Sequence, residues 1–230
     1  QLPVISLEHT LPVEGWPVEQ LDQFKNMVGH INVFISEYSQ NAWSVNGPST
    51  VIRHSIGTDL FTPDDTVEKK PQVLSVVHDF IKRDYCCNYS GWQRITEGLP
   101  VMVIGDTEGL SKQSESVEEL VREYQSSQVF LNTSTLSPIP MALLEAMACG
   151  LPCVTTANCM IPEIIEHGVN GFMSNDEGEL RAYIEKLLAD EDLRISLGKA
   201  ARETILNDFS EDNYISNWNK TFDLAYGMIK

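Results

Sequence analysis

Short runs of β-branched residues alternate with longer helical patterns along most of the chain, and this alternation limits the possible folds more than any other feature. It is typical of βα units and of a parallel sheet covered by helices. We expect strands at 3–8, 31–36, 73–78, 100–105, 128–133, 152–156 and 171–174, and helices at 17–28, 37–45, 87–97, 116–127, 140–149 and 162–167. The predicted fold class is therefore α/β, with a Rossmann-like parallel sheet.

The pattern changes after residue 175, where the strands stop and three helices are expected, at 177–189, 191–207 and 211–228. The run from Gly57 to Asp65 has the turn chemistry of a linker. We expect three parts: a partial α/β segment at 1–62, a complete Rossmann-like domain at 63–210, and a helix at 211–230 that packs back toward the first part.

Several residues indicate where the helices begin and end. Ser116, with Glu119 three residues later, has the pattern of a capping box. Gly150 and Gly168 suit the ends of helices, and Pro162 suits a first helical turn. These signals support the predicted helix boundaries.

The charge balance disfavours some partners. The chain has 33 acidic and 16 basic side chains, a formal net charge of -17, which repels phosphate backbones and anionic lipid surfaces. We therefore do not expect nucleic acid as a general partner, although a local basic pocket is compatible with this charge. No apolar run reaches the roughly 20 residues of a membrane span.

The cysteines and the first residues bear on location. The five cysteines are an odd number without a C-x-x-C pair, which favours reduced thiols and a cytoplasmic location. Residues 1–30 lack the pattern of a secretory signal, and the start at Gln1 indicates trimming or excision of an initiator methionine.

The most informative stretch runs from Ser134 to Pro152, from a strand end through a loop and a helix to the next strand. In a parallel sheet, ligands collect at the carboxyl ends of strands and at helix N-termini. Glu145 lies among apolar helix residues and therefore needs a partner. Ribose hydroxyls of a ligand would supply it, and so would a structural lysine or a backbone donor.

With these residues the sequence resembles retaining glycosyltransferases of the GT-B fold, group 1 type, which transfer sugars from nucleotide-sugar donors. Glu145 and the residues after it match the end of the motif E-x7-E followed by A-M-A-x-G-x-P. Further matches, in family order, are Gly57 to Phe61 with G-I-D-x-x-x-F, Val103 to Asp106 with V-x-G-x-G, Ile161 to Glu163 with G-G-x-P-E, and Asn170-Gly171 with N-G. The resemblance runs from residue 1 to about 226 and implies a nucleotide-sugar-binding role for 63–210.

The resemblance implies roles for individual residues. Glu145 would accept hydrogen bonds from the donor ribose. Ser137 takes the place of the first family Glu, which lies by the transferred sugar, so a hydroxyl replaces a catalytic carboxylate. The family's basic pair, which neutralises the diphosphate, becomes His78 and Arg83, with Lys82 as an adjacent substitute. The alternative for these three is a solvated charge cluster at a helix start.

The loops that follow the strands supply the remaining predicted contacts. His9, at a strand end, matches a family histidine that faces the donor sugar, so a sugar contact or proton transfer is expected beside the alternative of an ordinary surface histidine. Cys159-Met160 replaces a glycine pair, and Asn158 is a polar contact. Positions expected to line the donor site are Ser134, Pro138, Ile139 and Met141.

We expect no metal ion and no cofactor, with the nucleotide-diphosphate-sugar acting as donor substrate. Asp64-Asp65 and the acidic run from Asp190 to Asp192 resemble metal motifs but fall in the linker and at a helix junction. The acceptor (saccharide, lipid, protein or modified base) and the oligomeric state stay open.

Residues 1–62 correspond only to the last two strands of the family's acceptor-binding domain. The chain is therefore a compact enzyme, a fragment of a longer one, or a donor-binding module that has lost catalysis. A retaining glycosyltransferase is the first prediction. A non-catalytic nucleotide-sugar-binding or regulatory protein is the rival, supported by Ser137, His78 and Cys159-Met160. A GT-B nucleotide-sugar epimerase is the third hypothesis.

Overall fold

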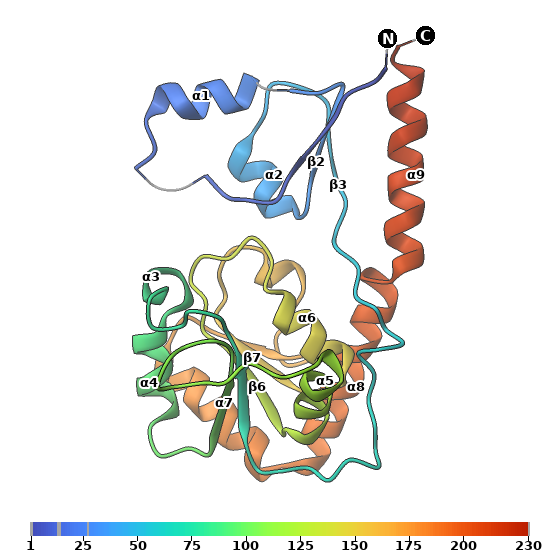
Figure 1. The fold of residues 1–230 in the computed structure, drawn as a ribbon. Coiled ribbons are helices and arrows are strands. Elements are labelled where there is room, and N and C mark those ends of the chain that lie inside the picture. The colour runs from blue at the N-terminus through green and yellow to red at the C-terminus, as the bar shows by residue number, and fades with distance from the viewer. Residues whose placement is uncertain (1, 13–14, 27, 230) are drawn as a thin grey trace. The chain divides into compact units, whose positions relative to one another are not determined.

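The computed structural model describes residues 2–12, 15–26 and 28–229, and the chain forms two compact units (Figure 1). The first unit comprises residues 1–55 together with 208–230, and the second comprises 56–207. These divisions fall after residues 55 and 207, compared with the boundaries after 62 and 210 that the sequence suggested.

The first unit contains a small parallel sheet of three strands in the order β1-β2-β3. Its elements are β1 (Ile5–Glu8), α1 (Val18–Asn26), β2 (Ile31–Phe34), α2 (Glu37–Trp43), β3 (Ser49–Val51) and α9 (Glu211–Gly227). The third strand was not predicted, because three residues after a proline are too short to show a strand period. Residue 27 of the predicted helix 17–28 lies outside the described residues.

The second unit contains a parallel sheet of five strands in the order β5-β4-β6-β7-β8. Its strands are β4 (Val73–Val76), β5 (Val101–Ile104), β6 (Val129–Asn132), β7 (Cys153–Thr155) and β8 (Phe172–Met173). Its helices are α3 (Asp84–Cys87), α4 (Tyr89–Thr96), α5 (Val117–Ser126), α6 (Met141–Ala148), the 3-10 turn η1 (Ile161–Glu163), α7 (Glu177–Ala189) and α8 (Glu191–Asp208). The predicted α/β class with a Rossmann-like parallel sheet is confirmed.

The core of the second unit is built from central strands that are buried on both faces, as parallel strands usually are. All four residues of β6 are buried, and α6 buries Leu143 and Leu144 completely. The one polar side chain inside β4, Ser75, is hydrogen bonded: its Oγ donates to Leu131 O at 2.8 Å and accepts from Trp92 Nε1 at 3.0 Å. Because this buried hydroxyl has both a donor and an acceptor partner, it does not bear the desolvation cost of an unpaired polar group.

Three local predictions need correction. The expected helix 87–97 begins later, as α4 at Tyr89, and a separate short helix, α3, precedes it, because Asn88 between them adopts a left-handed conformation at φ 56°. The expected helix 162–167 is only the single turn η1. The capping box at Ser116 is half formed: Ser116 Oγ accepts from Glu119 N at 3.2 Å, but the Glu119 carboxylate accepts from Glu115 N instead.

Gly150 follows α6 at φ 69°, as expected for a residue that ends a helix.

In the described ranges, no helix is both long and apolar enough to cross a membrane.

The backbone at Gly105 accepts only glycine. Gly105 follows β5 at φ 154°, and a Cβ there would collide with the carbonyl oxygen of Val77. We expect Gly105→Ala to lower the free energy of unfolding by at least about 1–3 kcal/mol, because the strain cannot be relieved without separating two backbones.

Gly227→Ala is the matched control for this substitution, because a Cβ at Gly227 meets no atom within 4 Å. There alanine should be neutral or stabilising. Both variants are compared by urea unfolding, and equal stability of the two would show that the loop after β5 adapts.

Candidate functional site

The carboxyl edge of the five-stranded sheet is the place where the predicted site residues gather. From β4 the chain crosses to β5 on one side, and then returns to β6 on the other side of β4. In open α/β sheets, ligands bind at such a switch point, outside the carboxyl ends of the strands. The loops 77–83, 133–140 and 156–160 follow β4, β6 and β7 at this edge.

Hydrogen bonds tie the loops after β6 and β7 to each other and to α3, the helix that follows the loop after β4. The backbone N–H groups of Thr135 and Leu136 donate to Cys86 O at 2.8 and 3.2 Å, which joins the loop after β6 to α3. Thr156 Oγ1, from the loop after β7, donates to Ser134 O. The predicted loop residues therefore belong to one connected surface, which is the requirement for a common ligand site.

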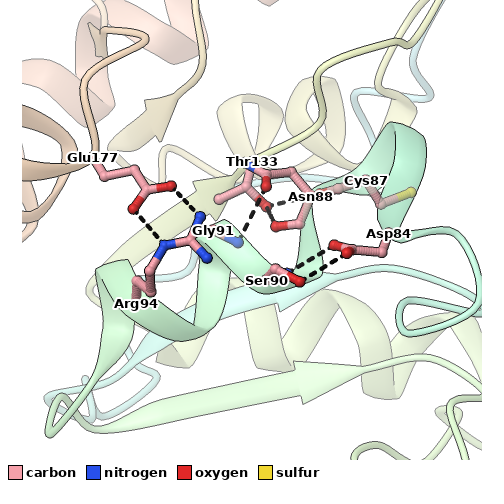
Figure 2. Close-up of polar contacts among 8 residues, drawn as sticks. All are labelled: Asp84, Cys87, Asn88, Ser90, Gly91, Arg94, Thr133 and Glu177. Atoms are coloured by element: carbon pink, nitrogen blue, oxygen red, sulfur yellow. Dashed lines mark hydrogen bonds and ion pairs between the residues drawn. The ribbon is translucent and has the colours of Figure 1, made fainter.

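The junction between α3 and α4 fixes the segment that carries Arg83 (Figure 2). Asn88 ends α3 and caps α4, since its side chain accepts from Gly91 N at 3.1 Å. Thr133 Oγ1, at the end of β6, donates to Cys87 O at 2.9 Å. Asp84 accepts from Ser90 N and Oγ at 2.8 and 2.7 Å. Side chains rather than helix length thus hold this short helix in place.

Among the three predicted cations, only Arg83 makes no ion pair with the described residues. Lys82 Nζ is 3.1 Å from Asp79 Oδ1, and His78 Nδ1 is 3.3 Å from Asp106 Oδ1. Burial and the neighbouring Cys86 raise the pKa of Cys87 to about 11, so the thiol next to Arg83 is neutral at pH 7. The full charge of the exposed Arg83 is therefore available to a ligand.

Asp106 was not among the predicted site residues, although it ends the motif that runs from Val103 to Asp106. The Asp106 carboxylate accepts from Asp79 N at 2.7 Å, and this backbone hydrogen bond, with a smaller contribution from His78, lowers the pKa of Asp106. Thr107 Oγ1 likewise accepts from Phe80 N at 2.8 Å. The loop after β5 therefore positions the loop after β4. The only signal for Asp106 in the sequence was its position at the end of a strand.

Glu145 has a protein partner that the sequence did not indicate. Its Oε2 accepts from Tyr124 Oη at 2.8 Å, and Tyr124 is fully buried in α5. Burial raises the pKa of Glu145, and the Tyr124 hydrogen bond opposes this shift. Tyr124 occupies one carboxylate oxygen and leaves Oε1 without a partner among the described residues. Glu145 is thus anchored on one side and open to another donor on the other.

The N-terminus of α6 adds backbone donors to this edge. Pro140 precedes the helix without a side-chain cap, and Leu143 N is the first amide to bond back to it, at 2.9 Å. The amides of Met141 and Ala142 are therefore left without an intrahelical acceptor, which favours an anion. Ser137, Pro138 and the neighbouring Ile139 are half-buried in the loop before this helix.

The loop after β7 carries Asn158 and Cys159. Cys159 adopts φ 52°, a conformation that favours glycine. Its Sγ lies 3.9 Å from Thr135 O, and Asn158 O accepts from Ile161 N at 3.0 Å. Both residues are partly exposed, so the Asn158 side chain remains available for a polar contact.

His9 belongs to the first unit, whereas the other predicted site residues belong to the second. It follows β1 and stacks on His54, with the ring centroids 5.3 Å apart and the planes 11° apart. Burial, and then the neighbouring His9, lowers the pKa of His54. His54 was not predicted. The catalytic roles of His9 and Ser137 stay predictions, as do the binding roles of the other residues.

No three His, Cys, Asp or Glu side chains come together as metal ligands within the described ranges. The metal-like acidic pairs are explained locally: Asp64, for example, accepts from Thr66 N and Oγ1 at 2.9 and 2.6 Å in a turn.

The chain has the fold of the GT-B glycosyltransferases. Sucrose-phosphate synthase from Thermosynechococcus elongatus superposes with a TM-score of 0.81 over 97% of this chain and 68% of its own, at 16% identity. Anabaena HepE, solved in complex with UDP-glucose, superposes with a TM-score of 0.80 over 96% and 72%, at 17% identity.

Residues 110–204 match the family model of the glycosyl transferases group 1. N-acetyl-alpha-D-glucosaminyl L-malate synthase from Bacillus anthracis is 34% identical over 98 residues, which are 42% of this chain and 26% of that protein. Sulfoquinovosyl transferase SQD2 from Arabidopsis thaliana is 33% identical over 116 residues, 48% of this chain and 21% of its own length. The chain thus spans about a quarter of the length of these relatives.

Glu145 should make the stability of the chain depend on pH. Because burial raises the pKa of Glu145 above its ordinary value of 4.5, the carboxyl favours folding when protonated. This contribution is present below pH 4.5 and is lost as the pH rises through the raised pKa. Glu145→Gln does not titrate but still accepts from Tyr124, so its stability relative to the wild type should rise from acid to neutral pH.

The measurement is the free energy of unfolding in urea across this pH range. The exposed Glu68→Gln is the matched control. A difference between Glu145→Gln and the wild type that stays constant, or falls with pH, would contradict the burial argument.

Proposed function

We propose that this chain binds the donor of a retaining glycosyltransferase, a nucleotide-diphosphate-sugar, and that it is the donor-binding part of that enzyme. The observation that carries this proposal is the half-buried Glu145, whose one oxygen is held by Tyr124 while the other is free. In a protein that binds no ligand at this carboxylate, no hydrogen bond to the second oxygen would offset the desolvation cost.

The ribose and the diphosphate of the donor suit different parts of the site. Glu145 accepts from the ribose hydroxyls, which are neutral donors to a charged acceptor. Arg83 binds the diphosphate, because its fork of N–H groups suits phosphate oxygens and its charge is unpaired. The free amides at the start of α6 add the electrostatic contribution of a helix N-terminus. The UDP-glucose complex of HepE supports this class of ligand.

The transfer itself separates charge. The bond between the sugar and the diphosphate breaks, negative charge develops on the departing diphosphate, and positive charge develops on the sugar. The acceptor hydroxyl then bonds to the same face of the sugar carbon and gives its proton to an oxygen of the departing diphosphate. Arg83 stabilises the leaving group. Ser137 hydrogen bonds a sugar hydroxyl but supplies no negative charge, so turnover by this chain is slow.

The remaining assignments follow the same proposal. His9 is the residue of the first unit that contacts the sugar or takes part in proton transfer, and the donor is used without a metal or another cofactor. Asn158, Ser134, Pro138, Ile139 and Met141 line the sugar side of the donor site. The five cysteines, all free, suit a reducing compartment such as the cytoplasm.

Replacing Glu145 tests the ribose contact. Glu145→Gln should weaken binding of UDP by roughly 1.5–3 kcal/mol, because a hydrogen bond to a charged acceptor is lost or becomes neutral. Titration calorimetry with UDP, ADP and GDP measures this loss for whichever nucleotide binds. Glu68→Gln is the control and should bind as the wild type does. If no nucleoside diphosphate binds the wild type, or if Glu145→Gln binds equally well, the proposal is wrong.

Replacing Arg83 tests the diphosphate contact, with Lys82 as a built-in comparison. Arg83→Ala should reduce affinity for the nucleoside diphosphate about tenfold or more, since a charge-assisted hydrogen bond is removed. Lys82→Ala should have a smaller effect, because Lys82 is already paired with Asp79. Binding of the free nucleoside should be unchanged in both. If Lys82→Ala reduced the affinity for the nucleoside diphosphate more than Arg83→Ala did, the diphosphate would be placed at Lys82.

A further inference from the structure

The second unit has a pocket at the opposite edge of its sheet. Ser127 and Gln128 precede β6, and Gly150 and Pro152 precede β7, so these residues mark the amino ends of the strands. Together with α8 and the start of the unit they enclose a cavity of about 700 Å³. This volume is that of a small-molecule site. Because β6 separates the two edges, the pocket is distinct from the proposed donor site.

Four cations line this pocket, and none of them makes an ion pair with the described residues. They are Lys69, Arg194, Lys199 and Arg202. In a chain with 33 acidic and only 16 basic side chains, cations would be expected to find carboxylates easily. Five other cations of the same unit do so: Lys70, Lys82, Arg94, Lys112 and Arg181.

Backbone carbonyls hold three of these cations without neutralising them. Arg202 donates to Thr58 O, Phe61 O and Ala148 O at 2.6–2.9 Å. Arg194 Nη1 donates to two carbonyls at the end of α7, and Lys69 Nζ donates to Gln125 O at 2.6 Å. The Lys69 side chain is exposed over much of its length, but burial around its ammonium lowers its pKa. Burial lowers the pKa of Arg202 as well.

The pocket lining holds as many acidic residues as cations, but the acidic residues form no ion pair with these cations in the described part of the chain, and Asp65 acts on Lys69 only beyond ion-pair distance. Asp64 is engaged by Thr66 in its turn, whereas Asp65, Glu191 and Glu203 are exposed and form no ion pair in the described part of the chain. The cations of the pocket lining therefore have no carboxylate in direct contact within the described part of the chain.

One residue of the pocket lining, Gln128, carries a polar atom without a partner among the described residues. Gln128 Oε1 is buried and accepts no hydrogen bond from the described residues. Buried side-chain oxygens are rarely left this way in folded proteins, and the exceptions call for an explanation such as a bound molecule. A hydroxyl group donates the hydrogen bond that this oxygen lacks. This observation is independent of the charges.

We propose that this pocket binds a small organic anion that carries hydroxyl groups, of the chemical class of a sugar phosphate. The phosphate meets Lys69, Lys199 and the remaining N–H groups of the arginines, which suit phosphate oxygens. A hydroxyl donates to Gln128 Oε1 once this side chain rotates toward the cavity, because in the structure the oxygen lies out of reach of solvent. Pro63, Pro152 and Ile195 supply the apolar surface that packs against carbon atoms. The site is additional to the donor site and does not depend on its assignment.

Titration of the whole chain with three probes tests the proposal. Glucose 6-phosphate should bind at about millimolar or lower concentration and raise the melting temperature. Inorganic phosphate should bind more weakly, because it does not reach Gln128, and glucose should not bind. Absence of glucose 6-phosphate binding would overturn the proposal. Equal affinity for phosphate and glucose 6-phosphate would overturn the hydroxyl contact.

Variants then locate the site. Lys199 is exposed and makes no ion pair with the described residues, so Lys199→Gln should fold normally and weaken glucose 6-phosphate binding about two- to fivefold. Gln128→Leu should reduce glucose 6-phosphate affinity without changing that for phosphate. Lys220→Gln, an exposed lysine of the first unit, is the control and should change neither. If Arg83→Ala weakens the sugar phosphate and Lys199→Gln does not, the ligand occupies the carboxyl edge and the proposal is wrong.

Discussion

Parallel pairing of β4, β6 and β7 is the constraint on which the rest of the second unit depends. Because the three strands run in the same direction, their carboxyl ends meet at one edge and their amino ends at the other. Each loop at the carboxyl edge then donates to or accepts from its neighbour, as Thr135 does with Cys86. A loop position is therefore set by several strands at once, and the side chains it carries are held before any ligand arrives.

The same constraint creates a conflict at Glu145. The helix α6 must pack its apolar residues against β6 and β7, and the carboxylate is carried into that packing with them. Burial opposes its charge, and a single tyrosine hydroxyl compensates for part of that cost. A glutamine would satisfy Tyr124 equally well at a lower desolvation cost. Stability alone does not account for a carboxylate at this position, and the proposed contact with ribose hydroxyls would account for it.

The sequence predicted those features of the fold that depend on local periodicity. The strand pattern and the α/β class followed from it, as did the placement of Ser137 and Glu145 on a strand–loop–helix unit. Features that depend on single residues were missed. The separation of α3 from α4, for example, rests on Asn88, which is left-handed and whose side-chain oxygen caps α4. Periodicity averages over such positions and cannot reveal them.

Contacts between distant segments were beyond reach for a different reason. The Tyr124 partner of Glu145 and the Asp106 partner of His78 lie 21 and 28 residues away along the chain, and only the strand order brings them together. The pairing of Lys82 with Asp79 is local, but it competes with many exposed alternatives. The sequence therefore indicated His78 and Arg83 as the basic pair, with Lys82 as a substitute. Of these three, Arg83 is the one that forms no ion pair with the described residues.

The net charge of -17 and the two proposed anion sites are compatible because they act over different distances. Charges more than about 8–10 Å away are largely screened at physiological ionic strength, so most carboxylates of the chain hardly affect a bound phosphate. A cation in contact acts across about 4 Å, where the attraction is several-fold stronger than in bulk water if solvent is partly excluded. Local unpaired cations therefore decide where an anion binds. The overall charge slows the approach of anions and, by the same repulsion, disfavours long polyanions that must lie along the surface.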